Sequence, residues 1–118
     1  MKLVLPLQIY KEGQILEIIP DPKLIAVTQQ SGEIIDAFNQ IKIDPSQPIS
    51  RQAETLNHEL LHTCGFDNIQ NEKDLTIAGE RYFGVLIANP HYLNFLLGLS
   101  QNVFNQPSGQ RKIDDSIE

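Results

Sequence analysis

The sequence predicts an α+β fold, with a small, mostly antiparallel sheet in the N-terminal half followed by three helices. The first half carries short runs of Ile, Val and Leu separated by Pro, Gly and Asp. The second half carries longer apolar segments at helical spacing. Because the strands precede the helices instead of alternating with them, the pattern indicates α+β and not a parallel α/β sheet.

Length and composition indicate one compact domain. The chain has 118 residues, of which 41% are hydrophobic, as in ordinary globular proteins. We expect residues 1–104 to form a single minimal domain. The final segment, "NQPSGQRKIDDSIE", is polar and aperiodic, so residues 105–118 are expected to form a flexible C-terminal tail.

Charge and cysteine content exclude several classes of partner. The net charge is -6 and no cluster of Lys or Arg occurs, which argues against direct binding of nucleic acid. No stretch has the length and apolarity of a membrane span, and the first residues do not resemble a signal peptide. The single cysteine, Cys64, fits a reducing compartment. We therefore expect a cytoplasmic protein without a membrane partner.

Four apolar runs are expected to be strands. Turn residues separate them, namely Glu12-Gly13, Pro20-Asp21-Pro22 and Ser31-Gly32. The runs are "LVLPLQIY" (3–10), "ILEII" (15–19), "LIAV" (24–27) and "IKID" (41–44).

Capping residues predict where the three helices begin. Ser50 is a suitable N-cap for a helix over about 51–64, which ends before Gly65. Asn71 can cap a second helix that runs to about residue 88, with Gly79 and Gly84 as weak points. Asn89-Pro90 places a cap before a proline at the first helical position, which predicts a third helix that contains "HYLNFLLGL" (91–99).

The sequence "HELLH" (58–62) lies on the first predicted helix and indicates a zinc site. At 100° per residue, His58 and His62 lie about 40° apart and one turn apart, so both imidazoles can bind one ion. Glu59 lies about 100° from His58, where its carboxylate would face a zinc-bound water. Zinc lowers the pKa of such a water to about 7, and Glu59 would accept its proton as general base in peptide hydrolysis.

The opposite side of this helix is apolar, with Ala53, Leu56, Leu60 and Cys64 expected to be buried in the core. Cys64 is therefore interpreted as a small hydrophobic residue and not as a metal-proximal thiol. An HExxH string also occurs by chance, in which case both histidines would be ordinary surface residues.

Two other residues could serve the site. His91 could reach the zinc or polarise a carbonyl group, but an exposed histidine is expected. Tyr82 could stabilise an oxyanion, but its apolar neighbours favour a packed helix face.

Residues 31 to 90 resemble the small phage-type zinc metallopeptidases related to the ImmA/IrrE group. The stretches that carry the resemblance are "GEIIDAFNQIKIDPSQPISRQAETLNHELLH", "EKDLTIAG" and "ANP". The resemblance implies a zincin-like fold, Zn²⁺ as the cofactor and a protein or peptide substrate, with a transcriptional repressor as one candidate.

The resemblance also implies a third metal ligand on the helix after the HExxH helix, and Glu72 in "EKDLTIAG" takes that position. A helical hairpin would also bring the start of the second helix close to His62. Glu80 is the alternative, because its separation from His62 is typical of other glutamate-liganded zincins. The metzincin pattern is not completed, because Asn68 stands where a His or Asp ligand is required and Met1 is the only methionine.

Two functions follow from these observations. The preferred hypothesis is a zinc metallopeptidase in which His58, His62 and Glu72 bind the metal and Glu59 is catalytic. The alternative is a non-catalytic interaction module, either stabilised by zinc or free of metal, since small domains often need a metal to offset a limited core.

Overall fold

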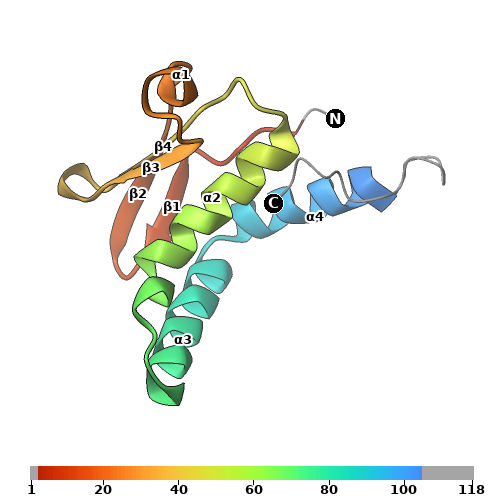
Figure 1. Cartoon of the computed structure of the whole chain (residues 1–118). Helices are drawn as coiled ribbons and strands as arrows, with labels where there is room; N and C mark the ends of the chain where they lie inside the picture. The colour runs from red at the N-terminus through yellow and green to blue at the C-terminus, as the bar shows by residue number, and fades with distance from the viewer. Residues whose placement is uncertain (1–2, 105–118) are drawn as a thin grey trace.

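The computed structural model describes residues 3–104, which form a four-stranded sheet and four α-helices (Figure 1). The strands are β1 (Gln8–Lys11), β2 (Gln14–Pro20), β3 (Gly32–Ile35) and β4 (Gln40–Ile43). The α-helices are α1 (Leu24–Thr28), α2 (Ile49–Thr63), α3 (Glu72–Ala88) and α4 (Pro90–Phe104), and the 3-10 helices are η1 (Asp36–Phe38) and η2 (Phe66–Asn68). This architecture confirms the predicted α+β class. The predicted tail, residues 105–118, lies outside the described residues.

The sheet is mixed, with the strand order β1-β2-β4-β3. The pairs β1–β2 and β3–β4 are antiparallel, as expected, but the central pair β2–β4 is parallel. A parallel pair needs a crossover connection, and the chain between β2 and β4 provides it through α1 and β3. The expectation of a mostly antiparallel sheet therefore holds for the outer pairs and is wrong at the centre.

The predicted strand "LIAV" is wrong, because residues 24–28 form the short helix α1. Its start is fixed from outside the segment, since the backbone N–H of Ile25 donates to Oδ2 of Asp44 at 2.9 Å. The strand β3, in turn, occupies "GEII", where only the turn Ser31-Gly32 was predicted. Its residues pair with β4, and Ile34 lies opposite Ile41.

The three long helices lie close to their predicted ranges. The cap of α2 differs, because its N-cap is Pro48, which has no side chain able to accept a hydrogen bond, and not Ser50. The cap of α3 is confirmed, since Oδ1 of Asn71 accepts a hydrogen bond from the N–H of Asp74 at 2.9 Å. Helix α4 begins at Pro90, as predicted. None of the helices within residues 3–104 is long and apolar enough to cross a membrane.

One hydrophobic core joins the sheet to the helices. The residues that α2 contributes are the four predicted from its apolar side, Ala53, Leu56, Leu60 and Cys64. The sheet contributes Ile9, Leu16, Ile18, Ile41 and Ile43, and the last two helices contribute Val85, Tyr92 and Phe95. Because the apolar side of α2 is packed in this way, its histidine side is left facing outward.

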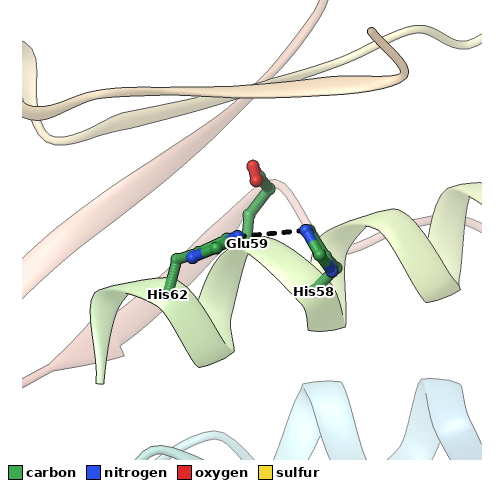
Figure 2. A group of neighbouring side chains, drawn as sticks. All are labelled: His58, Glu59 and His62. Carbon is green, nitrogen blue, oxygen red and sulfur yellow. Dashed lines mark hydrogen bonds between the residues drawn. The ribbon is translucent and has the colours of Figure 1, made fainter. Parts of the chain in front are cut away.

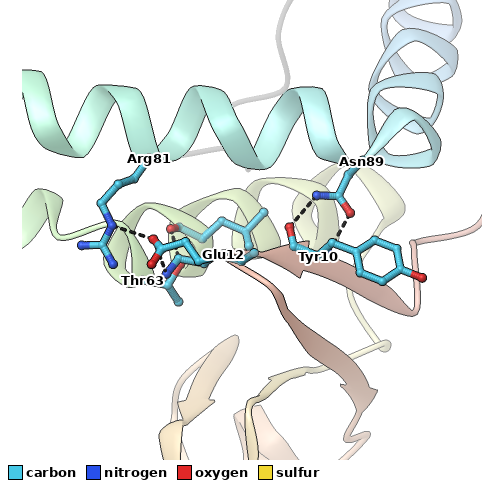
Figure 3. Close-up of polar contacts among 7 residues, drawn as sticks. Tyr10, Glu12, Thr63, Arg81 and Asn89 are labelled. Carbon is cyan, nitrogen blue, oxygen red and sulfur yellow. Dashed lines mark hydrogen bonds and ion pairs between the residues drawn. The ribbon is translucent and has the colours of Figure 1, made fainter.

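Two polar contacts tie the last helices to the β1–β2 hairpin (Figure 3). The side chain of Asn89, at the junction of α3 and α4, accepts a hydrogen bond from the N–H of Tyr10 and donates one to the carbonyl of Tyr10, both at 2.8 Å. Nε of Arg81 on α3 lies 2.7 Å from Oε1 of Glu12 in the hairpin turn. These contacts fix α3 against the sheet edge that is far from β3.

Candidate metal centre

His58, Glu59 and His62 form one group on the outward side of α2. Their potential ligand atoms all lie within 4.8 Å of one another, and no other described residue joins such a group. Figure 2 shows the imidazole rings of His58 and His62 directed toward one another from successive turns of α2, nearly perpendicular with an interplanar angle of 83°, and Glu59 extending from the helix between them. The Nε2 atoms of the two histidines are 3.0 Å apart. The convergence expected from helical spacing is therefore present.

The donor set fits a zinc ion. At a Zn–N distance of about 2.0–2.1 Å, two imidazole nitrogens on one tetrahedral zinc are roughly 3.3 Å apart. The Nε2 atoms of His58 and His62, at 3.0 Å, need only a small opening to reach this separation. Two imidazoles and a nearby carboxylate are also the donor types that catalytic zinc sites use.

Glu59 is enclosed between the helix and the sheet, with only 7% of its surface exposed. This burial raises the pKa of its carboxyl group, and the charge of Glu33 on β3 adds to the rise, while His58 and His62 oppose it. A carboxylate with a raised pKa is a stronger proton acceptor. The position suits a general base beside a metal.

A cleft of about 620 Å³ opens over the group. One wall is the segment before and at the start of β3, and the other is the outward side of α2. Its lining residues are Gln29, Gln30, Ser31, Gly32, Arg51, Glu54, Thr55, Asn57, His58, Glu59, Leu61 and His62. Substrate-sized space is therefore present next to the three predicted residues.

Gly32 sets the width of the cleft where β3 passes α2. A Cβ atom at this position would lie 2.5 Å from Cγ2 of Thr55 and 3.3 Å from Cγ of Glu59. Only a residue without a side chain permits this approach. Gly32 was predicted only as part of the turn Ser31-Gly32, and no local pattern in the sequence indicates this close approach to α2.

Asp67 is a second residue whose role was not predicted, because in the sequence it is only out of register for a metzincin ligand. It lies in η2, and its Oδ2 atom is 3.4 Å from Nδ1 of His62. A carboxylate at Nδ1 favours the tautomer that leaves Nε2 free to bind a metal. Its position five residues after His62, just beyond Gly65 at the end of the helix, is the signal that could have identified it.

The two candidates for the third ligand, Glu72 and Glu80, are both exposed on α3, and neither belongs to the metal-ligating group. Helix α3 packs against a different side of α2, where the hydroxyl of Tyr82 donates to Oδ1 of Asn57. Asn57 lies about 100° around the helix from His58. The packing of α3 therefore separates its acidic residues from the histidine pair.

Tyr82 and His91 also lie outside the group. Tyr82 packs against the core, and burial raises the pKa of its hydroxyl group. His91 is exposed at the start of α4, where its Nε2 atom is 2.7 Å from the carbonyl oxygen of Gln8. Tyr82 therefore belongs to a packed helix face and His91 is an exposed histidine, as predicted for both residues.

Comparisons with known proteins found no matching family model, no similar curated protein and no similar solved structure. The chemistry of the site is therefore argued from its own geometry. Of the four predicted site residues, the structure brings together His58, Glu59 and His62 and leaves Glu72 apart. Two nitrogen donors, a buried carboxylate and an adjoining cleft can support hydrolysis assisted by a metal ion.

Proposed function

We propose that this protein is a zinc-dependent metallopeptidase with a zincin-like arrangement of helix and edge strand. The observation that carries the proposal is the 3.0 Å approach of the two Nε2 atoms beside the buried Glu59, at the floor of a cleft. His58 and His62 would hold the ion. When bound, zinc would act as a Lewis acid that lowers the pKa of a water and polarises a peptide carbonyl.

The chain's own residues supply the remaining chemistry. Glu59 would accept the proton of the attacking water and return it to the leaving amine, for which its raised pKa is suited. Asp67 would hold His62 through Nδ1. Glu72 and Glu80 remain candidates for a third ligand. For either glutamate to reach the ion, the connection between α2 and α3 would have to move.

Strand β3 offers a place for an extended peptide. It is the outer strand of the sheet, and within residues 3–104 no strand pairs with its free edge. A peptide that added to this edge would form main-chain hydrogen bonds next to Glu59. Antiparallel addition is favoured, because antiparallel pairs are somewhat more stable per residue than parallel ones.

The substrate would be a protein or peptide, with a transcriptional repressor as one candidate. We propose a cytoplasmic location, which the single cysteine of the chain, Cys64, supports because a chain without an internal disulfide fits a reducing compartment.

One observation favours a second function. Glu59 lies within reach of the same ion as the two histidines, and no other described carboxylate does. If Glu59 binds the metal directly, the group becomes a structural site that stabilises an interaction module and has no free base. The two functions therefore differ in what Glu59 does.

The variants Glu59→Gln and His58→Ala separate the two functions. The protein is purified without chelator, and its zinc content and its cleavage of a denatured protein substrate are measured. The peptidase proposal expects Glu59→Gln to keep zinc and stability while losing at least about 100-fold in cleavage rate, and His58→Ala to lose zinc. Wild-type protein that binds no zinc, or a Glu59→Gln variant that loses zinc together with stability, would contradict it.

A further inference from the structure

Arg51 is a cation in the cleft that the proposed chemistry does not use. It is half-buried, lies seven residues before His58 and faces the same side of α2, since seven residues are almost two full turns. Among the described residues no acidic side chain forms an ion pair with it. An unpaired guanidinium that lines a cleft is suited to bind a carboxylate from a ligand.

Two neighbours define the electrostatics around Arg51. Glu54 also lines the cleft, but its Oε2 atom is buried without a hydrogen-bond partner and is not paired with Arg51. The N-terminus of α2 is adjacent, and no side chain caps its free N–H groups. The positive end of the helix dipole therefore adds to the charge of Arg51. The whole chain carries a charge of -6, and Arg51 is the one Lys or Arg among the residues that line the cleft.

The direction of β3 relates this cation to a bound peptide. Ser31 and Gln29 share a hollow with Arg51, and Gly32 lies against Thr55 and Glu59. The segment therefore runs from Arg51 towards Glu59, in the same direction as α2. A peptide that pairs antiparallel with β3 would run the opposite way, so its C-terminal part would lie at Arg51.

The distance along α2 between Arg51 and His58 gives the position in the peptide of the carboxylate that Arg51 would bind. Seven residues of α2 span about 10 Å, and an extended peptide advances about 3.4 Å per residue. We propose that Arg51 binds a substrate carboxylate about three residues beyond the cleaved bond on its C-terminal side. This inference rests on the proposed peptidase function and names its substrate class, which is peptides with an acidic side chain or a free C-terminus at that position.

Peptide binding tests the proposal without relying on turnover. Zinc-loaded, ¹⁵N-labelled Glu59→Gln protein is titrated with three hexapeptides of one sequence while NMR shifts are followed. One has an amidated C-terminus and is neutral, one has a free C-terminus, and one is amidated with a Glu at the corresponding position. At least one acidic peptide should bind about tenfold more tightly than the neutral one. Tighter binding of the peptide with a free C-terminus would identify a chain end as the source of the carboxylate, and tighter binding of the Glu-containing peptide would identify a side chain.

Arg51→Gln in the same background should abolish this preference, and Arg51→Glu should reverse it in favour of a Lys-containing peptide. Lys73→Gln is the matched control, because it removes one positive charge from an exposed site outside the cleft. Equal binding of all three peptides, no binding of the acidic ones, or an unchanged preference in Arg51→Gln would overturn the proposal. Binding through Arg51 by a wild-type protein that cleaves nothing would instead contradict the peptidase function alone.

Discussion

Asp67 is the residue whose contribution to the metal centre can be separated most cleanly from folding. Its carboxylate and the imidazole of His62 are both substantially exposed, so their contact adds little to stability. The Asp67 carboxylate is instead expected to orient the imidazole ring of His62. We predict that Asp67→Asn weakens zinc affinity about tenfold, the lower end for such supporting carboxylates, and leaves the unfolding midpoint of the metal-free protein unchanged. Competition with a chromogenic chelator measures the zinc affinity of each protein.

Asp36→Asn, an equal charge change at an exposed position of η1, is the control for this experiment. If Asp67→Asn binds zinc as tightly as Asp36→Asn does, then Asp67 does not orient His62.

Asp44 is a second residue with a measurable signature, in the pH dependence of stability. It is 1% exposed, and its carboxylate accepts hydrogen bonds from the hydroxyl and N–H of Ser46 and from the N–H of Ile25. These bonds, the Ser46 hydroxyl first, lower its pKa. A lowered pKa in the folded state stabilises the protein above about pH 4, where the unfolded carboxyl is also ionised, and this contribution is lost as the pH falls through the folded pKa.

Urea unfolding of Asp44→Asn and wild type between pH 3 and 7 tests this expectation. The variant should unfold at lower urea at pH 7, and the gap between the two midpoints should narrow below about pH 4. A gap that stays constant across this range would show that the Asp44 carboxylate is not the titrating group.

At the scale of elements, the contact between β3 and α2 depends on Gly32. The methyl group of Gly32→Ala would overlap Cγ2 of Thr55, so β3 or α2 must shift, at a cost of roughly 1–3 kcal/mol. Thr55→Ser removes the atom that clashes. Gly32→Ala should therefore lower the free energy of unfolding much less in the Thr55→Ser background than it does in the wild-type protein. Free energies of unfolding in urea provide this double-mutant cycle.

Gly79→Ala is the control, because a Cβ atom there meets nothing within 4 Å. It should stabilise α3 by about 0.5–1 kcal/mol. A Gly32→Ala variant as stable as wild type, or one that Thr55→Ser does not rescue, would show that β3 and α2 are not in tight contact.

The elements that the sequence predicted well are those whose signals are local. Asn71 caps α3, Asn89-Pro90 begins α4, and the spacing of His58 and His62 places both on one side of α2. Helix α1 and strand β3 were missed because distant partners fix them. Asp44 caps the start of α1, and β3 forms by pairing with β4. The separation of Glu72 from the histidines has the same origin, since it depends on how α3 packs.

At the scale of the whole molecule, Asn89 joins the two halves of the chain. It is fully buried, and its side chain acts like one residue of a neighbouring strand, pairing with both the N–H and the carbonyl of Tyr10 on the outer strand β1. It also donates to the carbonyl of Val85 at 2.6 Å. No sequence pattern indicates a contact across 79 residues. The sheet and the helices should therefore unfold together.

Asn89→Ala is the test of this coupling. It leaves the N–H and carbonyl of Tyr10 without partners beside the core, which should cost roughly 2–4 kcal/mol. Asn89→Asp should also destabilise the protein, because a carboxylate would face the carbonyl oxygens of Tyr10 and Val85.

Asn94→Ala, at an exposed position of α4, is the control and should be neutral or slightly stabilising. Urea unfolding gives the stabilities, and amide hydrogen exchange at Tyr10 should accelerate to match the lower global stability. If Asn89→Ala unfolds at the same urea concentration as Asn94→Ala, the two halves are held together by the apolar core alone.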